Sequence, residues 1–477
     1  MTGFFHLQTA AERLAQAREG LNTPLGERLI GLLGIATILA IAALLSYDRR
    51  RINWRLVAAG LGLQFVFGVL VLKTEAGRRF FSAVGDAITG LLRFQEQGAR
   101  FVFGNLVQNQ VPVGMPGAGG ALDTTAGMVA QTGAFFAFNV LPTIIFFSAL
   151  MSVLYYVGVM QLVVKGLAWV MQKTLGTSGA ETLSASGNIF LGQTEAPLLI
   201  KPFVKTMTPS ELITVMVGGF ATVAGGVLAA YVGMLSGLFP GIASHLLAAS
   251  VMNAPAGLLL AKILLPETGT PLTKGSLTVP TEPVEAEKPR RLSFKSLRSS
   301  SGTTDSSIIE AAANGAGQGV QLAINVAAML MAFVALVALL NFLLGWAGGL
   351  VGMPDLSLQG ILGFLLRPLA WLMGVPWQDT AYVGGLIGLK TTLNEFFAYA
   401  QFGNDLAAGI ELAPRSAIIL TYALLGFANL SSIAIQIGGI GGLAPERRPE
   451  IAKFGLRAMI AGNLAAMLSA SLAGMLA

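Results

Sequence analysis

The chain has 477 residues, of which 54% are hydrophobic and only 11% are charged. Segments so poor in charge must bury apolar surface all round, so the composition excludes an ordinary soluble domain and indicates a polytopic helical membrane protein. The net charge of +6 at pH 7 gives no reason to expect a nucleic-acid partner. The absence of cysteine excludes disulfides, and only two histidines are present, so we expect neither a histidine-built metal centre nor a bound cofactor.

The N-terminal part is predicted to contain an amphipathic segment and two membrane spans. Residues 1–24 combine apolar and charged side chains in the manner of a helix that lies on a membrane surface. Two spans follow, ending at about residues 46 and 72, and the loop between them, 48–55, carries four arginines. The positive-inside bias places this loop in the cytoplasm, which puts the N-terminus on the periplasmic side.

The next stretch leads from the outer face into a third span. Residues 75–104 are predicted to form an interfacial helix, 105–131 a glycine-rich external loop, and 133–158 the third span. A fourth span begins at Thr208-Pro209-Ser210-Glu211, which is a capping box with proline at the first helical position.

The remaining spans are predicted at about 243–265, 320–345, 416–441 and 456–477. Residues 267–305 are rich in Pro, Ser, Thr and basic residues, which is typical of a flexible cytoplasmic linker. A second basic loop, around Arg447 and Arg457, is also expected inside. The C-terminus would therefore be periplasmic.

Two halves of the chain share an ordered series of matches. The matched pairs are Asn139-Val140 with Asn325-Val326, Leu167–Met171 with Leu369–Met373, Glu195 with Glu395, and Gly219-Phe220-Ala221 with Gly426-Phe427-Ala428. Chance could explain the apolar pentapeptide by itself, but it does not explain the order of the whole series. Each half would contain three spans and one re-entrant hairpin, and three crossings require the second copy to be inverted.

The predicted fold is therefore an all-α polytopic membrane protein with eight transmembrane helices and two opposed re-entrant hairpins. Paired interrupted segments in inverted repeats indicate the midplane site of a secondary transporter. The expected units are 1–24, 25–72, 73–131, repeat one at 132–266, the linker 267–305, and repeat two at 306–477.

The strongest candidate for chemistry is Ser186–Pro197, a polar stretch that reads as a broken hairpin tip. A carboxylate inside the bilayer is costly, so Glu195 and its counterpart Glu395 are candidate functional residues, unless both lie idle at the headgroup level. Gln193 and Thr194 offer amide and hydroxyl groups that suit a neutral heterocycle.

Polar groups near Glu395 suit a sugar. A carboxylate that accepts from two hydroxyls, with Asn429, Ser431 and Ser432 nearby, fits a diol, and Phe427 offers an aromatic wall.

Oxygen atoms suited to a hard cation such as sodium occur at two places in repeat one, within Ser186–Pro197 and directly after Gly219-Phe220-Ala221. The candidates are Asn188, the Leu191 carbonyl, Thr222 and the Val223 carbonyl. The Thr222 hydroxyl could instead bond back to its own helix. Lys390 could pair with a carboxylate or lie at the interface, and the sequence does not decide between these two places.

The segments Gly192–Leu198, Asn394-Glu395-Phe396 and Gly426–Ser432 resemble the concentrative nucleoside transporter family, and the similarity extends from about residue 25 to the C-terminus. The resemblance implies a homotrimer in which each chain is divided into a scaffold and a transport domain. It also implies import of nucleosides such as uridine by an elevator-like movement coupled to a cation gradient. The form Gln-Thr-Glu-Ala-Pro resembles the sodium-coupled, bacterial inner-membrane type.

The resemblance also assigns roles. It implies that Gln193, Thr194 and Glu195 lie near the base, that Val227 and Phe427 pack against it, that Glu395, Asn429 and Ser432 hold the ribose, and that Asn188, Leu191, Thr222 and Val223 bind sodium. One alternative is a proton-coupled nucleoside symporter. A membrane-embedded transferase is a second alternative, but it would require Asp-rich metal motifs and basic phosphate clamps that the sequence does not contain.

Overall fold

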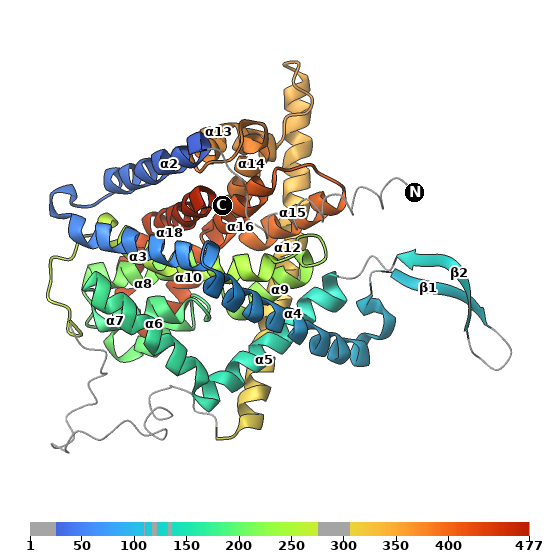
Figure 1. The fold of residues 1–477 in the computed structure, drawn as a ribbon, viewed down its shortest axis with the longest axis horizontal. Helices are drawn as coiled ribbons and strands as arrows, with labels where there is room; N and C mark the ends of the chain where they lie inside the picture. Colours follow the sequence, from blue (N-terminus) through green and yellow to red (C-terminus); the bar gives the residue numbers. More distant parts are fainter. Residues whose placement is uncertain (1–24, 109, 117–121, 132–135, 275–305, 477) are drawn as a thin grey trace.

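The computed structural model describes residues 25–108, 110–116, 122–131, 136–274 and 306–476. Within these ranges the chain is almost entirely helical, and the long helix α12 extends beyond the rest of the bundle (Figure 1). The predicted amphipathic segment 1–24 and residues 275–305 of the predicted linker lie outside the described residues.

Three helices precede the first repeat. They are α2 (Leu25–Leu44), α3 (Trp54–Leu72) and α4 (Glu75–Phe103), with short 3-10 turns at Arg49–Arg51 and Gly104–Val107. The Asn53 side chain caps α3 by accepting from the Leu56 N–H, and Thr74 caps α4 by accepting from the Gly77 N–H. Each helix therefore begins where a short polar side chain can satisfy its free N–H groups.

The prediction that residues 105–131 form an external loop is wrong in one respect, because this stretch contains a β-hairpin. Strands β1 (Gln110–Pro116) and β2 (Leu122–Gln131) pair antiparallel, with Gln110 opposite Gln131, and project away from the helices (Figure 1). The β-branched residues of this stretch favour extended backbone, a signal that its glycine content concealed. The prediction of an all-α protein holds apart from this hairpin.

Repeat one contains the following elements in order: a π-helical turn (Phe136–Val140), α5 (Leu141–Val157), α6 (Val159–Leu175), α7 (Gly179–Gly187), a 3-10 segment (Ala196–Phe203), α8 (Pro209–Ala221), α9 (Gly225–Leu235) and α10 (Ile242–Leu264). The capping box predicted at Thr208 and Glu211 is confirmed, and a second one joins Ser178 to Glu181 at the start of α7.

Repeat two contains α12 (Ile308–Gly349), α13 (Leu358–Leu372), a 3-10 turn (Trp377–Asp379), α14 (Thr380–Thr392), α15 (Glu395–Ala407), α16 (Pro414–Leu424), α17 (Leu430–Leu443), a 3-10 turn (Pro445–Arg447) and α18 (Arg448–Leu476). The sixth span was predicted too short, since α12 has 42 residues.

The predicted fourth and seventh spans are each divided in two. The helix stops at residues 222–224 between α8 and α9, and again at 425–429 between α16 and α17. If α8 and α9 are counted together as Pro209–Leu235, six helices in the described ranges are long and apolar enough to cross a membrane, and three shorter apolar helices accompany them. We call residues 222–224 break one and residues 425–429 break two.

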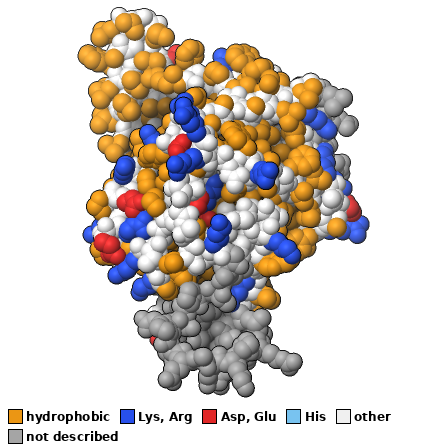
Figure 2. All heavy atoms as spheres, turned by 90° about the vertical axis from the view of Figure 1, so that its left-hand side faces the viewer, with side chains coloured by type: hydrophobic (Ala, Val, Ile, Leu, Met, Phe, Trp, Pro, Cys, Tyr) orange, Lys and Arg blue, Asp and Glu red, His pale blue; other side chains and the backbone are white. Residues whose placement is uncertain are grey.

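The basic loops predicted on a common side lie at one end of the molecule. The Tyr47 N–H donates to the Leu264 carbonyl at 2.8 Å, and the Arg457 guanidinium lies 4.0 Å from the centre of the Tyr47 ring. Arg447 Nη1 donates to the Met207 carbonyl at 2.8 Å. Figure 2 shows this end, where Lys and Arg side chains are spread over the surface and apolar side chains lie along its margins.

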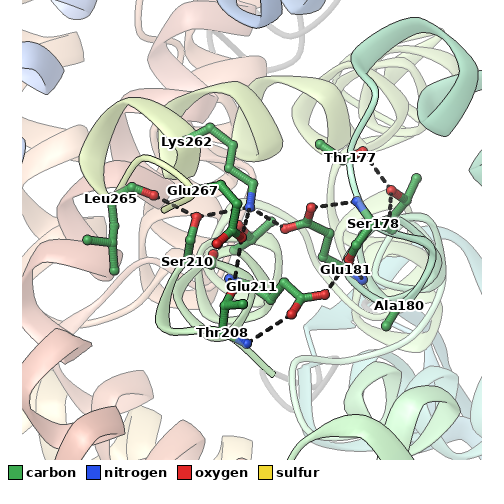
Figure 3. Close-up of polar contacts among 12 residues, drawn as sticks. Thr177, Ser178, Ala180, Glu181, Thr208, Ser210, Glu211, Lys262, Leu265 and Glu267 are labelled. Atoms are coloured by element: carbon green, nitrogen blue, oxygen red, sulfur yellow. Dashed lines mark hydrogen bonds and ion pairs between the residues drawn. The ribbon is translucent and has the colours of Figure 1, made fainter. Parts of the chain in front are cut away.

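The base of α7 is fixed at the same end by the Lys262 cluster, which comprises Lys262, Glu181, Glu211, Glu267 and Ser178 (Figure 3). Lys262 Nζ lies 2.7 Å from Glu181 Oε2 and 3.4 Å from Glu267 Oε2. Ser178 Oγ donates to Glu211 Oε1, which joins α7 to α8. The cluster thus ties together α7, α8 and the end of α10.

The described part of the predicted linker, residues 267–274, packs onto this base. The Gly179 N–H donates to the Thr273 carbonyl at 2.9 Å, and the Ala180 N–H donates to Thr273 Oγ1 at 3.0 Å. Because two N–H groups in the first turn of α7 are satisfied in this way, the helix is held where its far end can form the tip of the site.

We predict that Lys262→Met lowers the free energy of unfolding by about 3–5 kcal/mol, because it leaves buried carboxylates without their cation. The matched control is Lys205→Met, whose ion pair with Glu446 at 3.7 Å is exposed and should contribute less than about 1 kcal/mol. Thermal unfolding of the purified protein in detergent measures both. Equal shifts in the two variants would contradict a stabilising role for the cluster.

Candidate functional site

The first tip of the site follows α7. The helix ends at Gly187, and the chain turns through residues 188–195 before the 3-10 segment begins. The Gly192 N–H donates to Glu195 Oε2 at 3.0 Å, which holds the carboxylate within its own turn. The Gly225 N–H donates to the Phe190 carbonyl at 2.8 Å, so the tip lies against break one.

The second tip carries Glu395 at the first position of α15. Asn394 caps this helix by accepting from the Phe397 N–H at 2.8 Å. The positive end of the helix dipole favours a carboxylate at this place. Glu395 is buried, and its Oε1 accepts from the Tyr231 hydroxyl at 3.1 Å while its Oε2 accepts from Asn429 Nδ2 at 3.0 Å.

The first turn of α17, directly after break two, supplies the hydroxyl groups of Ser431 and Ser432. Asn429 caps α17 by accepting from the Ser432 N–H at 2.9 Å, and its Oδ1 also accepts from Ser431 Oγ at 2.7 Å. The cap therefore fixes the Asn429 amide so that its Nδ2 faces Glu395. The Asn429 side chain thus joins the start of α17 to the Glu395 carboxylate.

The two repeats touch directly across the site. Gln193 Nε2, from the first tip, donates to Ser432 Oγ at 3.1 Å. Gln436 Nε2 donates to Gln193 Oε1 at 3.1 Å and to the Met216 carbonyl at 3.0 Å. The amide group of Gln193 is thus oriented by residues that lie more than two hundred positions away.

One pocket unites all of the predicted substrate-binding residues. It encloses about 730 Å³ of space between the protein atoms, part of which is open to solvent. Its walls include Gln193, Thr194, Glu195, Val227, Glu395, Phe427, Asn429 and Ser432. The side chains that α12 contributes to it are all apolar: Leu322, Val326, Met329 and Leu330.

The two Gly-Phe-Ala segments occupy matching places. Asn253 Nδ2 on α10 donates to the Ala221 carbonyl at 2.8 Å, and Asn463 Nδ2 on α18 donates to the Ala428 carbonyl at 2.7 Å. The Phe427 N–H donates to the Thr222 carbonyl at 3.2 Å, which joins the two breaks. The predicted internal repeat therefore has a physical counterpart in the way each repeat supports its own break.

The candidate cation ligands lie at the first tip and at break one. Asn188 is fully buried, and neither its Oδ1 nor its Nδ2 has a hydrogen-bond partner. Its side chain faces α8, since a Cβ at Gly218 would lie 3.3 Å from Asn188 Nδ2. Thr222 Oγ1 donates to the Gly218 carbonyl at 2.9 Å, so the back-bond considered for it forms, yet its oxygen retains lone pairs that a cation could use.

Two residues of the site were missed by the sequence analysis, namely Tyr231 and Gln436. Each follows a predicted site residue by four positions on a helix, Tyr231 after Val227 and Gln436 after Ser432. Residues four apart share a helix face. This spacing would have identified both.

Comparisons with known proteins agree with this geometry. Family models described as "Na+ dependent nucleoside transporter" match residues 33–106 (N-terminus) and 245–474 (C-terminus), and a model described as "Nucleoside recognition" matches 137–238. An uncharacterised transporter of Haemophilus influenzae is 43% identical over 94% of this chain and 97% of its own.

Two further matches have more informative names. Sodium/nucleoside cotransporter 1 of Mus musculus is 42% identical over 94% of this chain and 64% of its own length. A solved structure described as CNTnw in an inward-facing substrate-bound state has a TM-score of 0.78 and 43% identity, and the match covers 94% of this chain and 97% of that one. These relatives are transporters rather than enzymes, so the alternative of a membrane-embedded transferase is wrong.

We predict that Gly426→Ala disrupts the site's framework. Gly426 has φ +117°, and a Cβ there would lie 2.7 Å from the Phe220 carbonyl oxygen and 2.8 Å from that of Ala221. The strained backbone and these overlaps should together cost at least about 2 kcal/mol of stability, measured by thermal unfolding. Gly438→Ala, with open space around its Cβ, is the control and should leave the melting temperature unchanged or raised. Equal melting temperatures would contradict the close approach of the two breaks.

Proposed function

The chain belongs to the family of Na+-dependent nucleoside transporters, and we propose that it imports nucleosides such as uridine across a bacterial inner membrane by sodium symport. The family transports nucleosides in symport with a cation. The observation that carries the finer proposal is that side chains from both repeats meet in one pocket, with a carboxylate, amides and hydroxyls at hydrogen-bonding distance from one another.

Glu395 and its neighbours form the proposed ribose end. Each oxygen of a carboxylate can accept about two hydrogen bonds. Tyr231 and Asn429 each use one of these, so one lone pair remains on each Glu395 oxygen for the two ribose hydroxyls. Ser432 lies at the same end. Two fixed donors also keep the carboxylate oriented before substrate arrives, which lowers the entropic cost of binding.

The first tip forms the proposed base end. Gln193 and Thr194 present amide and hydroxyl groups to a heterocycle, and Glu195 lies beside them in the same turn. Val227 and Phe427 provide apolar surface on which a planar base can pack. Gln193 bonds to Ser432 and Gln436, so a base that binds to the Gln193 amide would take the place of one of these partners.

The proposed sodium site consists of Asn188, Thr222 and the carbonyl oxygens of Leu191 and Val223. Buried polar atoms are almost always hydrogen-bonded, and the fully buried Asn188 amide without a partner is therefore a rare exception that calls for a ligand. Oxygen atoms at interrupted helices are the usual ligands of coupling ions in transporters. The same tip contributes to the base end, which gives the ion a direct route to influence nucleoside binding.

The apolar wall that α12 contributes supports elevator-type movement. The polar atoms of the pocket come from the two tips and break two, whereas α12 offers only side chains without hydrogen-bonding groups. A site can slide along such a wall without breaking hydrogen bonds. We propose that the paired tips and breaks form the mobile transport domain and that α12 belongs to the scaffold of a homotrimer, with the basic end of the molecule in the cytoplasm and both termini in the periplasm.

Sodium coupling and proton coupling make different predictions for uptake. In proteoliposomes, we expect uridine to accumulate when sodium is imposed outside, and not when only a pH gradient is imposed. Asn188→Ala should raise the sodium concentration needed for half-maximal uptake by about tenfold, because it removes one oxygen ligand. Uptake that ignores sodium but follows the pH gradient would favour the proton-coupled alternative.

Glu395→Gln tests the ribose assignment. The neutral amide cannot accept two hydroxyls as a charged carboxylate does, so uridine affinity should fall at least about a hundredfold. Isothermal titration of the purified variant measures this, and an unchanged gel-filtration profile serves as the folding control. 2′-Deoxyuridine should lose far less affinity than uridine on the same substitution. Uridine affinity equal to that of the unmodified protein would refute the assignment.

A further inference from the structure

Lys390 lies fully buried in the last turn of α14, away from any aqueous interface. Its Nζ donates to two backbone carbonyls of repeat two, Ala423 O at 2.9 Å and Leu425 O at 3.2 Å. The sequence left open whether this lysine pairs with a carboxylate or lies at the interface. The structure places it in neither position, because its hydrogen-bond acceptors are main-chain oxygens.

One of these carbonyls, that of Ala423, lies in the last turn of α16, and the other, that of Leu425, is the first of break two. Helix α16 ends at Leu424, and the last carbonyls of a helix have no partner within it and carry its negative partial charge. In the interior of a membrane protein each of them needs a donor or a cation.

Break one lacks a tethered cation in the matching position. The last turn of α7 contains no basic residue, whereas the last turn of α14 contains Lys390. The first tip instead presents the Asn188 side chain, whose two polar atoms are buried without a partner. By the repeat, the Ala423 and Leu425 carbonyls match those of Met216 and Gly218, which accept from Gln436 Nε2 and Thr222 Oγ1. Among the described residues, break two thus has a cation from the chain itself, whereas break one has neutral donors.

We propose that the Lys390 ammonium serves at break two as a built-in substitute for the cation that break one takes from solution. This inference rests on the proposed sodium site at Asn188. Its consequence is that Lys390 keeps the ribose end ordered at all times, whereas the base end becomes ordered when a sodium ion binds. The chain would therefore bind one sodium ion per nucleoside, because the Lys390 ammonium already occupies the second potential site.

Two substitutions of Lys390 separate this role from simple packing. Lys390→Ala removes the charge and leaves room for an ion beside the carbonyls, whereas Lys390→Met removes the charge but fills the space. At a sodium concentration that saturates the unmodified protein, both should raise the dissociation constant for uridine about tenfold or more. Raised sodium should restore binding to Lys390→Ala only, with a Hill coefficient that increases from about one towards two.

Titration calorimetry with uridine at several sodium concentrations, with choline replacing sodium at constant ionic strength, measures these effects. Lys453→Ala, at an exposed lysine, is the control and should behave like the unmodified protein. A packing role predicts instead that Lys390→Met retains its affinity and that sodium does not rescue Lys390→Ala, and either result overturns the proposal. If neither variant folds, Lys390→Arg and Lys390→Gln replace them, and equal uridine affinity in these two overturns it as well.

The same titrations test the proposed function and the role of Lys390 separately. Uridine binding to the unmodified protein that does not depend on sodium would refute the proposed function. Sodium-dependent binding to the unmodified protein, together with unchanged behaviour of both Lys390 variants, would refute only the role of Lys390.

Discussion

The structure depends on two interrupted helices that meet backbone to backbone inside a membrane protein. At the meeting point the Phe427 N–H donates to the Thr222 carbonyl, and Gly426 allows an approach that a side chain would block. Interrupting a helix at this depth frees N–H and carbonyl groups that lipid cannot satisfy. The surrounding side chains can therefore be understood by asking which of these groups each one satisfies.

Different residues perform this task on the two sides. Asn253 and Asn463 each donate to the alanine carbonyl of their own Gly-Phe-Ala segment, Lys390 donates to the end of α16, and Asn429 caps α17. The Asn188 side chain has no protein partner. Among the described residues, Asn188 is the buried amide of which both polar atoms lack a partner, which suits a ligand that binds there, and in this proposal that ligand is the coupling ion.

The pocket has a polar side and an apolar side, and the division follows the architecture. Hydrogen-bonding groups come from the tips and from break two, and they are tied to one another across the repeats by Gln193, Ser432 and Gln436. The wall from α12 has only dispersion and hydrophobic contacts to offer. A group of elements held together by directional bonds and bounded by a non-directional surface can move as one body.

Apolar run length, capping residues and costly intramembrane carboxylates are local signals. They sufficed to predict the membrane class, most helix positions, the repeat and most of the polar residues of the pocket, but not its apolar wall on α12. Glu395, Asn429 and Gln193 were identified in this way. The acceptors of Lys390 and Tyr231 and the meeting of break one with break two became known from the folded chain, because these contacts join residues far apart in the sequence. Helix breaks carry weak local signals, because glycine is common in membrane helices for packing as well. Burial and partners are properties of the fold, and no single stretch of sequence contains them.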